Sequence, residues 1–192
     1  MRQPCQSLHL LMTHSTLLFI QLALAGWLVA GCWDWWCHRR TKIETTSGLA
    51  ECGFHWALLA QGGLAVSLAL LVKPSMALVA CLALLWLAHQ ATTWVELRYV
   101  VQRRDVTPME QMVHSFLEMI PLGLIVVIAL DVWVQGTPGI ALWEWQRRTA
   151  AELPACHLLT YAAASLVLVG LPFAEEAWRC YRHRTQRRPT GP

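Results

Sequence analysis

Charged side chains are scarce in this 192-residue sequence, in which Asp, Glu, Lys and Arg together make up 14%. An ordinary soluble domain carries about 25% charged residues, so the chain lacks the polar surface that a soluble protein of this length needs. Hydrophobic residues reach 56%. This imbalance excludes an ordinary soluble enzyme and indicates a chain whose surroundings are themselves apolar.

Cysteine spacings typical of redox or zinc sites are also lacking. The seven cysteines form no CxxC pair and no Cys/His spacing typical of zinc. Most lie within or beside apolar stretches, so we expect small packing residues and not disulfides. The net charge of +3 comes mostly from the segment RCYRHRTQRRP. Because no separate basic domain is present, we expect no nucleic-acid partner.

Five apolar stretches approach the roughly 20 residues that a helix needs to cross a hydrocarbon core of about 30 Å. They cover residues 15–33, 53–72, 75–94, 115–134 and 157–174. We therefore predict an all-α integral membrane protein with five transmembrane helices, forming a single helical membrane domain over residues 1–192. Two hairpins should build a four-helix core, the fifth helix should be added to it, and residues 175–192 should form a basic cytoplasmic tail.

Basic residues are divided unequally between the two ends of the predicted helices. Eleven of the 15 lysines and arginines fall on the side of the 34–52 loop, the 95–114 loop and the tail. Positively charged segments stay in the cytoplasm, so we expect the N-terminus outside and the C-terminus inside a bacterial inner membrane. The basic tail is expected to attract anionic lipid head groups.

Histidines and acidic residues recur at helical spacing near the cytoplasmic ends of the first four helices. Several pairs stand four residues apart and so share one helix face. The predicted metal ligands are His38, Glu51, His55, His89, Glu96, Glu110 and His114. Additional ligands or supporting groups are Asp34, Glu44 and Glu118, with Arg39, Arg40, Arg103 and Arg104 as the basic residues around them.

Histidine and carboxylate together suit iron, manganese or zinc. Di-iron carboxylate proteins hold their metals with glutamates and Glu/His pairs that project from four helices, although those pairs stand three residues apart. We therefore expect a dinuclear metal site, with iron as the favoured metal. The expected activity is oxidation of a lipid or another membrane-soluble substrate at the cytoplasmic face, with electrons from a separate donor.

Two other interpretations remain open at this point. Two of the histidines could be the axial ligands of a b-type haem. The polar layer could also be purely structural, solvating helix ends and holding a partner subunit. Glu110 illustrates the second interpretation, because Thr107, Pro108 and Glu110 have the spacing of a capping box at a helix start.

The segments DWWCHRRTKIETTSGLAECGFH and RRDVTPMEQMVHSFLEMIP resemble those of a family of small, uncharacterised bacterial multi-span membrane proteins. The resemblance covers about residues 33 to 125 and rests on DxxxH, ExxxH, H…E and EQxxHxxxE motifs. The family pattern has an acid directly after the third-helix histidine and an aspartate seven residues after that histidine. This chain has Gln90 and Glu96 at those positions. The resemblance implies a multi-span membrane fold and brings no established activity with it.

Overall fold

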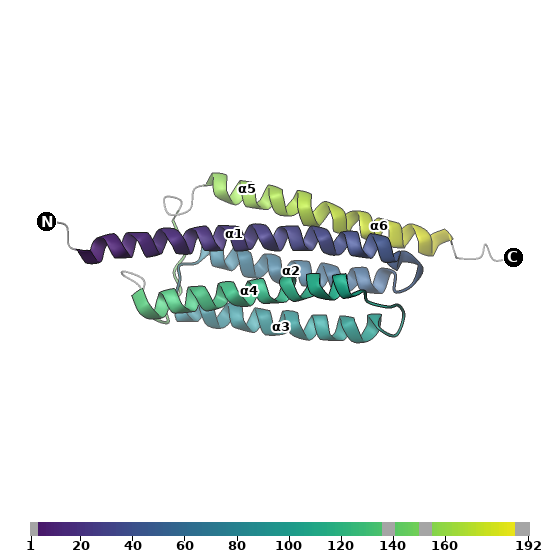
Figure 1. Ribbon diagram of the computed structural model, residues 1–192, viewed down its shortest axis with the longest axis horizontal. Coiled ribbons are helices and arrows are strands. Elements are labelled where there is room, and N and C mark those ends of the chain that lie inside the picture. Colours follow the sequence, from purple (N-terminus) through teal and green to yellow (C-terminus); the bar gives the residue numbers. More distant parts are fainter. Residues whose placement is uncertain (1–3, 136–140, 150–154, 187–192) are drawn as a thin grey trace.

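The computed structural model describes residues 4–135, 141–149 and 155–186. Its long helices are α1 (Pro4–Thr41), α2 (Leu49–Leu71), α3 (Met76–Val100), α4 (Pro108–Gln135), α5 (Ala155–Ser165) and α6 (Leu171–Gln186). A 3-10 helix, η1 (Ile43–Thr45), joins α1 to α2. A π-helical segment, η2 (Leu166–Gly170), joins α5 to α6, and the three run on as one rod (Figure 1).

The side chains are distributed as in a protein surrounded by lipid. Four helical segments are long and apolar enough to cross a membrane, namely α2, α3, α4 and the rod from Leu158 to Gln186. Helix α1 lies along the same bundle, and its N-terminal end extends past the other helices (Figure 1). Large apolar side chains such as Leu84 and Trp133 are exposed, whereas several carboxylates and histidines are buried. The chain is therefore an all-α membrane protein, as its composition predicts.

The helices extend beyond the apolar stretches that mark them in the sequence. Helix α1 continues to Thr41, α3 continues to Val100, and α4 begins at Pro108. The segment expected to be a tail from residue 175 is helical as far as Gln186. Hydropathy marks only the part of a helix at lipid depth, whereas backbone hydrogen bonding can continue through the polar turns beyond it.

The helices form a closed ring. Helix α1 packs against α4, α4 against α3, α3 against α2, and α6 against both α2 and α1. Helices α1 to α4 supply the four-helix core expected from the sequence, and α6 completes it by lying between α1 and α2. Five helices therefore present side chains to the interior at the end of the bundle where α6 lies (Figure 1).

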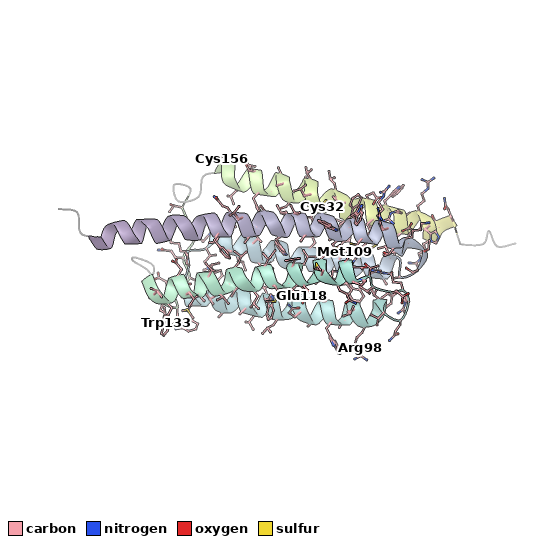
Figure 2. The ribbon with its side chains drawn as sticks, viewed as in Figure 1. Cys32, Arg98, Met109, Glu118, Trp133 and Cys156 are labelled. Atoms are coloured by element: carbon pink, nitrogen blue, oxygen red, sulfur yellow. The ribbon has the colours of Figure 1, made fainter. Side chains whose placement is uncertain are left out.

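The segment 141–149 covers the opposite end of the bundle. Its backbone pairs with the α2–α3 turn, because Lys73 N donates to Gln146 O and Arg148 N donates to Leu71 O, both at 2.8 Å. Trp133 and Cys156 lie toward this end, Arg98 lies toward the other, and Glu118 lies between them (Figure 2). The two ends thus differ, since the α2–α3 turn is short and the residues that join α1 to α2 form the more elaborate η1 turn.

A tryptophan of α1 repairs the break that a proline causes in α4. Pro121 has no N–H to donate to the carbonyl of Leu117. The indole of Trp27 donates to that carbonyl instead, at 3.1 Å. Such replacement is required at membrane depth, where no water can satisfy a free carbonyl. The same indole lies against Gly62 of α2, where an added Cβ would come within 2.6 Å of the ring.

We expect Gly62→Ala to destabilise the bundle, because the new methyl group would displace an indole that is already fixed by its hydrogen bond. Overpacking of this kind costs about 1–3 kcal/mol. The measurement is thermal unfolding of the purified protein in detergent. Gly63→Ala is the matched control, since a Cβ there meets nothing within 4 Å. Equal melting temperatures for the two variants would show that Trp27 does not fix α1 against α2.

Candidate metal centre

Five helices bring their acidic and histidine side chains together at the end of the bundle where α1 ends. The histidine–carboxylate cluster, as we name it, consists of Asp34, His38, Glu51, His55, Glu96, Glu110, His114 and Glu176. All except His114 are buried, and the side chain of His114 is 23% exposed. The four-residue spacing brings Asp34 to His38 and Glu51 to His55, as the sequence predicts.

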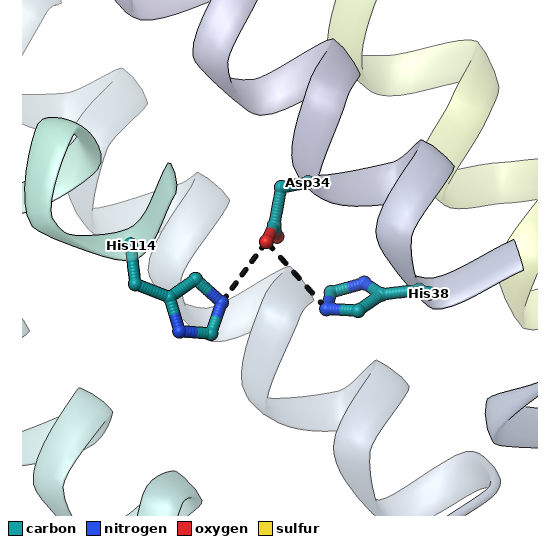
Figure 3. A group of neighbouring side chains, drawn as sticks. All are labelled: Asp34, His38 and His114. Atoms are coloured by element: carbon teal, nitrogen blue, oxygen red, sulfur yellow. Dashed lines mark ion pairs between the residues drawn. The ribbon is translucent and has the colours of Figure 1, made fainter. Parts of the chain in front are cut away.

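One group of three joins α1 to α4. Asp34 lies between two imidazoles, with Oδ1 2.9 Å from His114 Nε2 and 3.6 Å from His38 Nε2 (Figure 3). Asp34 and His38 stand on adjacent turns of α1, and His114 faces them from the second turn of α4. One ligand atom from each residue lies within 4.8 Å of the other two, so the group could hold a metal ion.

A second group of three joins α1 to α2 and shares His38. Glu51 Oε1 lies 4.0 Å from His38 Nε2 and 4.0 Å from His55 Nε2. These ligand atoms also lie within 4.8 Å of one another. Helix α3 adds Glu96, whose Oε1 lies 2.8 Å from His55 Nε2. Helix α4 adds Glu110, whose Oε1 lies 3.4 Å from His38 Nε2.

Glu176 of α6 fixes the orientation of two imidazoles at once. Its Oε2 lies 3.0 Å from His38 Nδ1, and its Oε1 lies 2.6 Å from His55 Nδ1. The two rings stack with centroids 4.3 Å apart and an interplanar angle of 2°. Metal-binding histidines almost always donate their other ring N–H to such an acceptor, which fixes the tautomer. Because a carboxylate accepts hydrogen bonds, Glu176 assigns Nδ1–H to both rings, and both Nε2 atoms turn toward the other carboxylates of the cluster.

The Nε2 atoms that face the centre of the cluster have no hydrogen-bond partner, and neither does Asp34 Oδ1. His55 Nε2 lies 2.8 Å from Glu96 Oε1, which is an ion pair when the imidazole is protonated. Buried polar atoms are normally paired, and either a proton or a metal ion between these atoms would pair them. Ligand atoms about 2.1 Å from one metal ion and at right angles would be about 3 Å apart. The arrangement therefore fits a shared cation.

Arg104, in the turn between α3 and α4, is the basic residue that the structure brings into the cluster. Its Nη2 donates to Glu51 Oε1 at 2.5 Å, and its Nη1 donates to Glu110 Oε2 at 3.0 Å. Burial alone would lower the pKa of this guanidinium, but the hydrogen bonds to Glu110 and Glu51 outweigh burial and raise the pKa above its ordinary value. Arg104 therefore stays charged and holds two carboxylates in place.

The other predicted basic residues lie outside the cluster. Arg39 pairs with Glu175 at 2.7 Å. Arg40 lies over the ring of Trp36, and Arg103 lies over the ring of Tyr99. Cation–π contacts of this kind are suited to the membrane–water interface, where the aromatic ring can contact lipid and the guanidinium can contact water.

Three of the predicted acids and histidines also lie outside the cluster. Glu44 pairs with Arg179 of α6. His89 and Glu118 line an adjoining cavity, together with Asp34, His55, Glu96 and His114 from the cluster. Helical spacing correctly places His89 on the face of α3 that carries Glu96, but the two residues are seven positions apart, so His89 lies deeper in the bundle.

Glu110 is more than a helix cap. The Thr107 hydroxyl accepts a hydrogen bond from Glu110 N at 3.2 Å, as a capping residue does. The carboxylate of Glu110, however, is fully buried and turns toward Arg104 and His38. The capping interpretation accounts for the backbone of this residue and leaves its side chain to the cluster.

A small apolar group closes the cluster at the end of the bundle. Ile43, Cys52 and Cys180 pack together there and are almost fully buried. The turn that carries Ile43 depends on Gly48, which has φ 61° and ψ −142°, a conformation that is essentially confined to glycine. Ser47 in the same turn donates to Glu51. The turn thus covers the cluster and positions one of its acids.

Sequence reasoning missed Glu176, because the fifth apolar stretch ends before it and several basic residues follow from Arg179 on. A signal was nevertheless present. Val169, Phe173, Glu176 and Cys180 stand at intervals of four, three and four, and all four are buried. That spacing is the pattern of one inward face of a helix, so it places Glu176 inside the bundle.

Comparison with models of known protein families, with curated proteins and with solved structures finds no match. The fold and the site themselves define an all-α membrane protein with a buried histidine–carboxylate cluster that could hold a metal ion.

We expect Glu176→Gln to weaken metal binding by about 10- to 100-fold, the usual effect of removing a carboxylate that orients metal-bound histidines. Glutamine offers only one acceptor oxygen and cannot orient two Nδ1–H groups. The measurement is a competition titration of the purified protein with a chelator.

Glu175→Gln is the matched control, since Glu175 stands next to Glu176 but binds Trp35 and Arg39 at the rim. Metal affinity that falls equally in both variants would mean that loss of charge, and not the orientation of His38 and His55, is responsible.

Proposed function

We propose that this protein is a membrane-embedded oxidoreductase that uses two metal ions, most suitably iron, to oxidise a lipid or another membrane-soluble substrate. The cluster lies at the end of the bundle that carries most of the basic residues, which we assign to the cytoplasmic face of a bacterial inner membrane. A soluble electron donor could approach that face, and the substrate could arrive through the bilayer.

One observation carries the proposal. His38 and His55 turn unpartnered Nε2 atoms toward Asp34, Glu51 and Glu96 while their Nδ1 atoms are held by Glu176. A neutral imidazole that donates from Nδ1 has a lone pair on Nε2, and a metal ion is the partner that such a lone pair and a carboxylate can share. Lone pairs that converge from several helices are the arrangement that metal coordination requires.

The charge of the cluster supports two ions. It contains five carboxylates and one guanidinium, so with neutral histidines it carries four negative charges. Uncompensated charge at membrane depth is very costly, and two divalent cations would cancel it. Asp34, His38 and His114 would hold one ion, and Glu51, His55 and Glu96 the other, with Glu110 within reach of both His38 and Arg104.

The donor set favours iron. The four carboxylates of the cluster other than Glu176 and its three imidazoles are the available ligands, and no cysteine is among them. This set matches the oxygen- and nitrogen-rich sites of di-iron proteins on four helices. Such an iron pair supplies the activation of dioxygen. Hydroxylation of a substrate C–H bond consumes one dioxygen, two electrons and two protons and gives an alcohol and one water. Desaturation with the same inputs gives a double bond and two waters.

The residues of this chain have distinct roles in that reaction. Glu176 holds His38 and His55 in the metal-binding tautomer, and Arg104 holds Glu51 and Glu110. The group around Ile43 excludes water from one side, which protects reactive species from side reactions. The adjoining cavity reaches His114, Glu96 and Asp34 and gives a substrate access to the same place.

A haem held by His38 and His55 does not suit this geometry. Their rings stack face to face at 4.3 Å, so the two Nε2 atoms cannot bind opposite faces of one porphyrin. A purely structural layer remains the competing function, and metal analysis separates it from the proposal.

We expect purified wild-type protein to contain two iron atoms per chain and to show no Soret band. Glu110→Gln should fold and insert normally, since glutamine preserves the helix start, but it should lose most of the iron because a charged ligand is gone. His114→Ala should lose iron in the same way. Elemental analysis and an optical spectrum measure both properties.

The controls are Glu144→Gln, in the segment that covers the opposite end of the bundle, and His183→Ala, in the last turn of α6. Neither should change the iron content. Iron that survives both Glu110→Gln and His114→Ala, or a wild type without metal, would favour the structural layer.

A further inference from the structure

One cavity of about 460 Å³ adjoins the cluster and runs along the bundle between α1, α2 and the rod of α5 and α6. Its volume falls within the range of small-molecule sites, about 300–1,000 Å³. At one end it is lined by His55, Glu96 and His114, and at the other end by Leu71 and Leu158. The cavity is therefore long, and its two ends differ chemically.

The dimensions suit a single extended chain. His55 and Leu71 both line the cavity and stand sixteen residues apart on α2, which corresponds to about 24 Å at the helical rise. A cavity of this length suits an extended hydrocarbon chain of the kind that membrane lipids carry.

Acidic and histidine side chains are confined to one end. Beyond His89, Thr93 and Glu118 the lining is mainly apolar, and its polar groups are the hydroxyls of Ser67, Tyr161 and Ser165. A ligand that fills the cavity must therefore be apolar over most of its length, with its main polar group where it meets the cluster. Because two divalent cations would already cancel the four negative charges of the cluster, another acid would add an uncompensated charge there, and an uncharged oxygen would not.

The side of the cavity is open between α2 and α5. Gly63, Ser67 and Leu71 of α2 and Ala162 of α5 line the cavity and are also exposed on the surface of the chain. Ser67 donates its hydroxyl to Gly63 O at 2.7 Å, so it presents no free donor to a passing chain. In a membrane this opening faces lipid, and a hydrocarbon chain could enter it without crossing water.

We propose that the cavity binds one long, straight-chain lipid, with an uncharged oxygen-bearing end at the histidine–carboxylate cluster and the methyl end near Leu71 and Leu158. The inference rests on the proposed function for the chemistry at the cluster, and it names the substrate class: a long-chain lipid that is oxidised close to its polar end.

The test uses full-length protein in nanodiscs of dimyristoylphosphatidylcholine and two probes based on hexadecan-1-ol. One probe carries a photoreactive diazirine near the methyl end, and the other carries it near the hydroxyl. Mass spectrometry of peptides then locates the cross-links. The methyl-end probe should label Leu70, Leu71 or Leu158, and the hydroxyl-end probe should label Leu59 or Phe173. Excess hexadecan-1-ol without a diazirine should compete with both probes and remove both sets of cross-links.

Two matched pairs of variants test the cavity itself. Gly63→Phe and Ala162→Trp place a ring in the cavity from opposite walls and should reduce cavity labelling at least tenfold. Gly53→Phe and Ala163→Trp are the controls, because these residues lie on the same helices at exposed positions that do not line the cavity. The probes should label both control variants as they label the wild type. Two independent blocking variants guard against misfolding of either one.

The proposal would be overturned if the methyl-end probe labelled Leu59 or Phe173 and the hydroxyl-end probe labelled Leu70, Leu71 or Leu158. Labelling that is confined to lipid-facing residues such as Leu64 and Leu84 in every variant would overturn it as well. Iron is measured in the same samples. The expected result is normal iron in Gly63→Phe and Ala162→Trp with labelling lost. Wild-type protein that takes up the chain in the expected order but contains no metal would refute the proposed function and leave the chain-binding site standing.

Discussion

The rest of the structure depends on the need to neutralise buried negative charge at the end of an apolar bundle. Five carboxylates are buried in one layer, and one guanidinium, that of Arg104, lies among them. A charge of this size would expel the helices from the membrane or from one another unless cations balanced it. Glu176 accepts the Nδ1 protons of His38 and His55, and the Nε2 atoms of both rings turn toward the other carboxylates. The layer can therefore be balanced by metal ions held between these atoms or by protons on the imidazoles, and its side chains could hold a metal ion.

Contacts between residues far apart in the chain position the side chains of that layer. The position of α6 between α1 and α2 is what allows one carboxylate to reach imidazoles of both helices. Glu175, one residue earlier, binds Trp35 and Arg39 and so fixes the same stretch of α6 from outside. Deeper in the bundle, Trp27 links α1 to the proline break of α4 and to Gly62 of α2. These contacts set the depth and rotation of each helix, and hence the convergence of its ligands.

Much of the fold and of the cluster could be predicted from the sequence, because these features depend on composition and on spacing within single helices. Composition predicts the membrane class, and the four-residue intervals predict that Asp34 faces the same way as His38 and Glu51 the same way as His55. What could not be predicted depends on how helices are placed around the ring. Nothing local to Arg103 and Arg104 shows that one turns to Tyr99 and the other to Glu51 and Glu110. Glu176 could not be predicted from hydropathy, because the apolar stretch ends before it whereas helix α6 continues to Gln186.

The central claim is that two metal ions lie within the histidine–carboxylate cluster, bound by nitrogen and oxygen atoms. X-ray absorption spectroscopy at the iron edge tests it most directly on the purified protein. The account predicts a first shell of nitrogen and oxygen atoms at about 2.0–2.2 Å with imidazole scattering. It also predicts a second iron at about 3.5–4 Å. Sulfur neighbours, a porphyrin signature, or an isolated iron with no metal neighbour would contradict it.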